Sequence, residues 1–212
     1  MKFRIVATLG LAALASSVLV ASDNLPGSES STASVSVPPA QFAPLTSSER
    51  FRNYLVGWVD AESILRAGAG AAIMQADGTP KEWRGGAEGY GKRIGSAYAE
   101  HTIDRTLEYG ISAVLHEDNR YFVSGETGFL RRTKYAIKST FLARHDDGRQ
   151  YFSFSRIGGA AGAGFISRAW QPRSTTSAGD GAESFGIIMA ADVGFNVFRE
   201  FWPDMKRRFR KH

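Results

Sequence analysis

The chain contains no cysteine and only four histidines among its 212 residues. The absence of cysteine excludes disulfides, thiol catalysis, iron–sulfur clusters and cysteine-ligated zinc sites. A chain of this length can form one domain with a sizeable core, which packing alone must hold together. We expect no metal and no cofactor.

Long hydrophobic runs are also missing outside the N-terminus. There, Lys2 and Arg4 precede an apolar run over 5–14, followed by a small-residue segment up to Ser17 and a short apolar stretch that ends at Ala21. This order predicts a secretory signal peptide over residues 1–21, and hence an exported, periplasmic or envelope-associated protein. An uncleaved anchor is the alternative, although the run is short of the roughly 20 apolar residues that span a bilayer.

Neither sign of charge is in large excess in the domain itself, although the whole chain has a net charge of +5. Of the 26 basic residues, two lie in the signal segment and five in the last seven residues, leaving 19 against 21 acidic residues. The five are Lys206, Arg207, Arg208, Arg210 and Lys211. This distribution predicts no nucleic-acid binding. It favours a solvated helix end whose cations complement the helix dipole, with a tail that contacts an anionic membrane surface as the alternative.

Helical periodicity dominates the rest of the chain. Residues 22–45 are rich in Ser, Pro and Ala and predict a flexible linker, and the domain is expected over 46–212. A capping pattern at 46–49 starts the first helix. Further helices are predicted over 61–76, 86–115, 128–143, 153–170 and from about 182 to Pro203. The fold class is therefore an all-α, compact bundle rich in glycine and alanine.

Small residues recur at a spacing of four in several of these helices, including the segments around Gly95 and Gly162. Such stripes let helix backbones approach closely, an arrangement favoured inside membranes. We expect instead the close packing of a soluble core, because the opposite faces of these helices are predicted to carry the charges.

Polar side chains also recur at helical spacing. They are His101, Asp104 and Glu108 in the long helix, and Asp192, Asn196 and Arg199 in the last one. The first stripe lies opposite an apolar face, so we expect it to face solvent, with a metal or acid–base cluster as the alternative. For the second stripe we expect surface pairing, with a buried network as the alternative.

Two segments resemble known motifs, one for binding nucleotide phosphates and one for binding zinc, but each motif is incomplete. Residues 86–93 match a phosphate-binding loop except that Arg93 stands where Ser or Thr must bind Mg²⁺. Residues 116–120 begin like a zinc-protease helix, but Arg120 replaces the second histidine and cannot ligate a metal. We expect neither segment to carry that chemistry.

Several short blocks between residues 80 and 208 are distinctive in combination. They are 82–83, 90–93, 115–122 (LHEDNRYF), 131–133, 154–156 and 200–204 (EFWPD). Together they resemble the blocks of an uncharacterised family of bacterial exported proteins. The resemblance implies a shared helical fold and transfers no catalytic residue.

The loop over 116–132 is the first candidate for a site. Its candidate acid–base residues are His116, Glu117, Asp118 and Arg120, and its candidate anion-binding residues are Arg131 and Arg132. The alternative, which we favour, is an ion-paired loop that clamps two helices, with Arg120 bridging Glu117 or Asp118.

These observations favour a non-catalytic exported cell-envelope protein with a structural or interaction role. One alternative is a hydrolase that uses the His116–Asp118 cluster, which requires these side chains to be buried together beside a cleft. The other alternative is a lipid- or ligand-binding bundle, for which a continuous apolar cavity is expected.

Overall fold

Six α-helices make up most of residues 43–210, the part of the chain that the computed structural model describes. They are α1 (Ser47–Val59), α2 (Ala61–Ala76), α3 (Gly86–Leu115), α4 (Phe129–Thr140), α5 (Phe154–Ile166) and α6 (Ala178–Phe209). One antiparallel hairpin pairs β1 (Leu142–Arg144) with β2 (Gln150–Phe152). The all-α fold is therefore confirmed, while the predicted signal peptide and most of the predicted linker lie outside the described residues.

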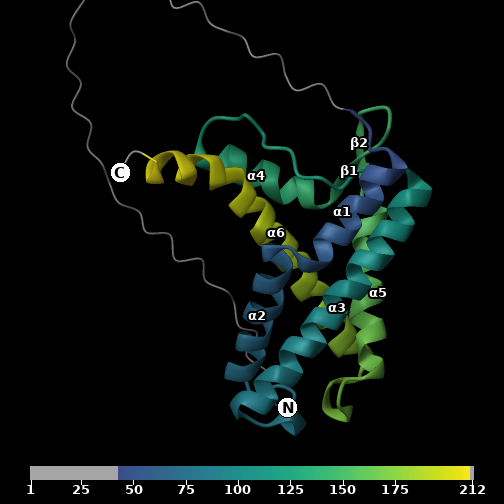
Figure 1. Ribbon diagram of the computed structural model, residues 1–212, viewed down its shortest axis with the longest axis vertical. Coiled ribbons are helices and arrows are strands. Elements are labelled where there is room, and N and C mark those ends of the chain that lie inside the picture. Colours follow the sequence, from purple (N-terminus) through teal and green to yellow (C-terminus); the bar gives the residue numbers. More distant parts are fainter. Residues whose placement is uncertain (1–42, 211–212) are drawn as a thin grey trace, which may run out of the picture. The chain divides into compact units, whose positions relative to one another are not determined.

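The long helix α3 organises the bundle. It packs against α1, α2 and α5, while α6 packs against both α5 and α4. Figure 1 shows α2, α3 and α5 running along the long axis of the molecule, with α4 and the C-terminal part of α6 lying across one end. The loops that connect α3 to α4 and α4 to α5 therefore gather at that end.

Side-chain caps fix where several helices begin. Thr46 and Glu49 form the expected capping box at the start of α1, and Asp60 accepts a hydrogen bond from the Ser63 backbone at the start of α2. A second capping box, between Ser177 and Asp180, starts α6 four residues before the predicted boundary. The polar loop before α6 is correspondingly shorter than expected.

The last helix also continues beyond its predicted end at Pro203. Proline removes one backbone donor and usually kinks or ends a helix. Here the following turn is held by Asp204, which pairs with both Arg132 of α4 and Arg207 of α6. The helix consequently runs on to Phe209, and its C-terminal part changes direction in Figure 1.

Glycine lets α5 lie directly on the backbone of α3. A Cβ atom at Gly159 would lie 2.9 Å from the Asp104 carbonyl oxygen and 3.1 Å from the Glu108 nitrogen. A Cβ atom at Gly162 would collide with the Leu107 side chain, so the predicted contact there is confirmed. The corresponding prediction for Gly95 is wrong, because that glycine is exposed and a Cβ atom there would meet no neighbour within 4 Å.

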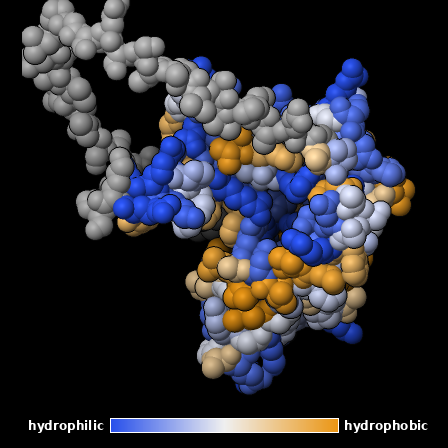
Figure 2. All heavy atoms as spheres, turned by 45° about the horizontal axis from the view of Figure 1, so that its top comes forward, coloured by the Kyte–Doolittle hydropathy of each residue, from blue (hydrophilic) through white to orange (hydrophobic). Residues whose placement is uncertain are grey.

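The distribution of polar and apolar side chains is the reverse of the one expected. Among the described residues, the buried apolar side chains are six alanines, Pro80 and Met189, whereas Arg93, Asp104, Glu117 and Glu200 are almost fully buried. Many large apolar side chains are exposed, and Figure 2 shows hydrophobic residues gathered over the lower half of the face that it presents. The prediction that the outer helix faces carry the charges is therefore wrong. Within residues 43–210, no helix combines the length and the apolar character needed to cross a membrane.

The α3–α5 contact can be tested with two matched glycine substitutions. Gly159→Ala should destabilise the fold by about 1–3 kcal/mol, because the α3 backbone must move away. Gly186→Ala on the exposed side of α6 should stabilise it by up to about 1 kcal/mol, because alanine is the better helix former and nothing lies within 4 Å. Chemical denaturation measures both values, and equal effects would contradict this description of the contact.

Candidate functional site

Glu117 in the candidate loop caps helix α5. Its side chain is buried and accepts hydrogen bonds from the backbone nitrogens of Phe154 (3.1 Å) and Ser155 (2.9 Å), and from the Ser155 hydroxyl. These backbone groups belong to the first turn of the helix, where they have no intrahelical partner. A carboxylate there also complements the positive end of the helix dipole. Glu117 therefore serves as a helix cap that comes from another part of the chain.

Asp118 ties the same loop to the hairpin and to Arg120. Its carboxylate accepts a hydrogen bond from Arg120 at 2.6 Å, so the expected ion pair is formed with Asp118 and not with Glu117. Its backbone exchanges two hydrogen bonds with Arg144 of β1, at 2.7 and 3.0 Å. The loop is therefore clamped between α3 and β1.

His116 lies apart from its two acidic neighbours. It ends α3 in a left-handed conformation (φ 56°), which turns the chain, and its exposed side chain lies 3.0 Å from the Asp146 carboxylate. Glu117 and Asp118 point into the protein instead. The structure therefore does not bring His116, Glu117 and Asp118 together as an acid–base cluster.

The two candidate anion-binding residues are also separated. Arg132 donates to Glu200 at 2.9 Å and pairs with Asp204, so the anions it binds belong to α6. Arg131 is exposed on α4. Arg132 therefore joins α4 to α6.

Glu200 is the residue on which this end of the molecule converges, and the sequence indicated it only as part of the EFWPD block. It is fully buried and accepts hydrogen bonds from the hydroxyls of Tyr121 and Ser124, both at 2.6 Å, besides the one from Arg132. Burial opposes its ionisation, but the donors from Ser124, Tyr121 and Arg132 outweigh it and lower the pKa of Glu200. The carboxylate therefore stays charged.

The polar stripe of α3 faces inward. His101, Asp104 and Glu108 are less than 10% exposed, so the prediction that they face solvent is wrong. Asp192 and Asn196 of α6 are buried as well, which agrees with the buried-network alternative, whereas Arg199 is exposed and pairs with Glu62 of α2. The physical reason is that arginines from other helices meet these carboxylates between α2, α3, α5 and α6.

Two arginines connect most of this interior network. Arg66 of α2 lies 2.9 Å from Glu62 and 2.7 Å from Asp192 of α6. Arg105 of α3 lies 2.6 Å from Glu108 and 3.5 Å from Asp192. Ion pairs therefore join α6 to both α2 and α3. Sequence reasoning missed Arg66, although a single charged pair in an otherwise alanine-rich helix could have indicated a buried partner.

The network contains as many arginines as carboxylates, but the carboxylates differ in how firmly they hold a proton. It comprises Arg66, Arg105, Arg156 and Arg199 on one side, and Glu62, Asp104, Glu108 and Asp192 on the other. Burial raises the pKa of Asp104 to about 7; Arg105 opposes this shift, while Glu108 and Asp192 reinforce it. Burial opposes the ionisation of Asp192, but Arg66, Arg105 and Arg156 outweigh it and lower its pKa. Asp104 is thus a carboxylate that holds its proton up to near-neutral pH, whereas Asp192 is ionised.

His101 beside the network is held neutral. Burial, reinforced by Arg105 and Arg66, lowers its pKa to about 4, and its Nε2 atom lies 2.9 Å from the Ser63 hydroxyl. Within residues 43–210, no three His, Asp or Glu side chains are arranged to hold a metal ion. His101 therefore has the environment of a hydrogen-bonded residue of the interior.

A cavity of about 390 Å³ lies over the network and beneath the 117–121 loop. Its wall includes charged groups of both signs, among them Arg66, Arg105, Arg156, Glu108 and Asp192. Figure 2 shows hydrophilic residues around a hollow on the face that it presents. A wall of this kind suits water or a small polar solute and does not form the continuous apolar cavity expected of a lipid-binding bundle.

Comparisons with protein-family models, with curated protein sequences and with solved structures find no match for this chain. The resemblance to a family of exported proteins therefore stays a prediction. The segments that carry it do meet in space, because Glu117 caps the helix that begins at Phe154 and Arg132 binds Glu200. Their combination thus has a structural explanation as a clamp.

The capping role of Glu117 predicts a loss of stability. Glu117→Ala should destabilise the protein by about 1–3 kcal/mol, because it leaves buried backbone donors of α5 unsatisfied. Glu126→Ala, at an exposed position in the same loop, is the control and should have little effect. Denaturation midpoints compare the two variants, and equal stability would contradict the capping role.

The proton on Asp104 predicts a pH-dependent effect on stability. The native state keeps this proton up to about pH 7, whereas the unfolded chain releases it near pH 4, so this group lowers stability as pH rises between those values. Asp104→Asn removes that loss. The unfolding free energy of the variant relative to wild type should therefore increase from pH 4 to pH 8. The exposed control Asp77→Asn should show no such trend, and a pH-independent difference for Asp104→Asn would contradict the assignment.

Proposed function

We propose that this chain is a non-catalytic, exported cell-envelope protein that acts as an interaction protein at an anionic membrane surface. The supporting observation is the surface formed by α4 and the C-terminal part of α6, here termed the basic face. Its exposed residues are Phe129, Leu130, Arg131, Lys134, Ile137 and Lys138 of α4, and Trp202, Lys206, Arg207, Arg208, Phe209 and Arg210 at the end of α6. They combine positive charge with large apolar side chains.

Helix α4 contributes a strongly amphipathic surface. It contains no acidic residue, and its inward positions are Ala136 and Thr140, both buried. Its one inward arginine, Arg132, is neutralised by α6. The outward positions therefore carry uncompensated positive charge next to Leu130, which is 71% exposed.

The end of α6 extends the same surface. The Phe129 and Phe201 rings stack at 5.3 Å, and the Arg132 guanidinium lies 4.4 Å from the Phe201 ring centre. These contacts join the two helices, so their exposed basic and aromatic residues belong to one face. Lys211, also expected in the tail, lies outside the described residues.

A surface of this composition fits the interface of an anionic bilayer. Each basic residue near such a surface contributes about 1 kcal/mol, and aromatic and aliphatic side chains insert at the headgroup level. The hydrolase alternative has less support, because His116 points away from Glu117 and Asp118. The ligand-binding alternative has less support, because the 390 Å³ cavity has a charged wall and the mostly apolar hollow of about 410 Å³ beside Trp83 and Trp170 is open at the surface.

Vesicle sedimentation tests this proposal with a protein of residues 22–212, which contains every described residue. It should bind anionic vesicles at low salt and be released by high salt. Replacing Lys134, Lys206 and Arg208 by glutamine should reduce binding by on the order of a hundredfold, at about 1 kcal/mol per charge.

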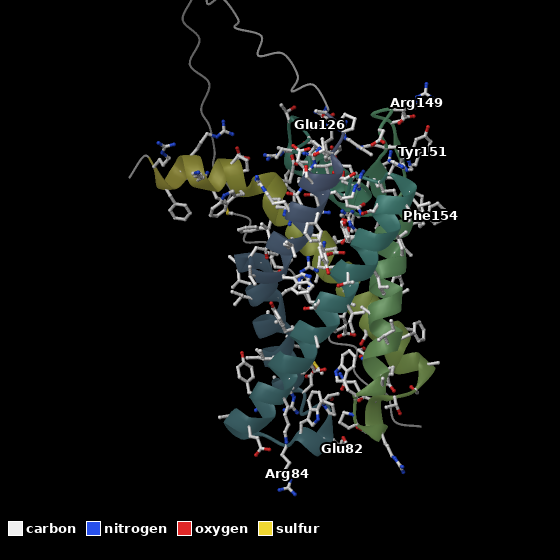
Figure 3. All side chains as sticks on the ribbon, turned by 45° about the vertical axis from the view of Figure 1, so that its right-hand side comes forward. Glu82, Arg84, Glu126, Arg149, Tyr151 and Phe154 are labelled. Carbon is white, nitrogen blue, oxygen red and sulfur yellow. The ribbon has the colours of Figure 1, made fainter. Side chains whose placement is uncertain are left out.

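The matched control removes three charges from the opposite end of the bundle, at Lys81, Arg84 and Arg173. Figure 3 shows Arg84 at the end far from Glu126. This control should bind as the parent protein does. The proposal fails if both triple variants bind equally, or if the parent protein ignores anionic vesicles.

A further inference from the structure

The outer surface of the bundle carries no exposed charge over four long segments. These segments, here termed the uncharged belt, are 61–76 of α2, 94–115 of α3, 154–166 of α5 and 184–198 of α6. Within these described ranges, every exposed residue is Gly, Ala, Thr, Val, Leu, Ile or Phe. Ile64 is 62% exposed and Ile187 is 59% exposed.

Charged residues do occur in the belt segments, but they turn inward. Arg66 of α2, Arg156 of α5 and Asp192 of α6 each bind partners on neighbouring helices. Helix α5 has Arg156 as its one charged residue, and that side chain is 8% exposed. The absence of charge from the outer surface is therefore a matter of orientation.

This orientation is the one that an apolar solvent favours. In water, a bundle buries large apolar side chains and exposes charges, whereas here the interior holds the charges and alanines. In lipid, ionisable side chains face the interior of a bundle, and small residues form the helix contacts, as Gly159 and Gly162 do here. From this pattern we infer that the belt contacts the acyl chains of a bilayer.

The shape of the belt favours lipid over a second copy of the chain. Helix α3 contacts α2 and α5, which lie on different sides of it in Figure 1, and both have uncharged outer faces. One partner protein covers one side of a bundle, while acyl chains surround it. Charged residues reappear at both ends, where Figure 3 shows Glu82 and Arg84 opposite Glu126 and Arg149.

The belt and the basic face also adjoin, since α6 contributes to both of them. Lipid contact through the belt rests on the proposed membrane role and deepens it. The basic face lies at the headgroups, and the belt lies among the acyl chains next to them. The ion-pair network then faces the polar cavity and not the belt.

Added charge in the belt distinguishes insertion from attraction by surface charge. If binding is electrostatic alone, Ile64→Lys and Ile187→Lys should leave binding to anionic vesicles unchanged or strengthen it. If the belt enters lipid, each should weaken binding at least tenfold. Thr127→Lys adds the same charge on an exposed loop and serves as the control.

Labelling gives a second readout that does not depend on lysine variants folding. Because the chain lacks cysteine, Ile64→Cys, Ile187→Cys and Thr127→Cys each provide a single attachment site for an environment-sensitive fluorophore. With anionic vesicles that carry a quencher on the acyl chains, emission from positions 64 and 187 should shift to the blue and be quenched at least twofold. Position 127 should change little.

The outcomes separate the two proposals. Vesicle binding without quenching at positions 64 and 187 overturns lipid contact by the belt and leaves the membrane role intact. If the fluorophores at positions 64 and 187 are already shielded from water without vesicles, and the protein is dimeric in solution, the belt is an interface with a second copy and lipid contact is overturned. Absence of vesicle binding overturns both proposals. Quenching on both helices together with weaker binding of the lysine variants supports the inference.

Discussion

Arginine–carboxylate pairing inside the bundle is the interaction on which the other contacts depend. Alanine and glycine give the interior little apolar volume, so the hydrophobic effect alone does not specify how α2, α3, α5 and α6 fit together. A buried charge costs several kcal/mol unless it is paired. Arg66 and Arg105 must therefore both reach Asp192 of α6, and this requirement restricts the relative positions of three helices.

The same rule governs the end of the molecule at which the loops gather. Glu200 and Glu117 are buried carboxylates, and each is satisfied by donors from distant parts of the sequence. Acidic loop residues that look catalytic in the sequence instead hold distant segments together, as Glu117 does for helix α5. Acidic, basic and aromatic residues close together in a sequence therefore also indicate a clamp, and distances between side chains decide between the two interpretations.

The sequence predicted the helices well and their orientation poorly. Caps and breakers at Thr46, Asp60 and Gly86 act locally, so α1, α2 and α3 begin where expected. Which face of α3 is buried depends on partners far away in the sequence. Opposite faces of that helix carry apolar and ionisable residues, and only the positions of Arg66 and Arg156 show that the ionisable face is inside. Glu200 was unpredictable for the same reason, because its donors are Tyr121 and Ser124 of the loop and Arg132 of α4, all far away in the sequence.

The inverted distribution of side chains has a consequence for the thermodynamics of unfolding. The heat capacity of a protein rises on unfolding mainly because apolar surface becomes hydrated. Here residues such as Ile64, Leu130 and Ile187 are already more than half exposed in the folded bundle. Unfolding in water therefore exposes less new apolar surface than a typical domain of this length does. The free energy of unfolding should therefore change unusually little with temperature and fall unusually slowly with denaturant concentration.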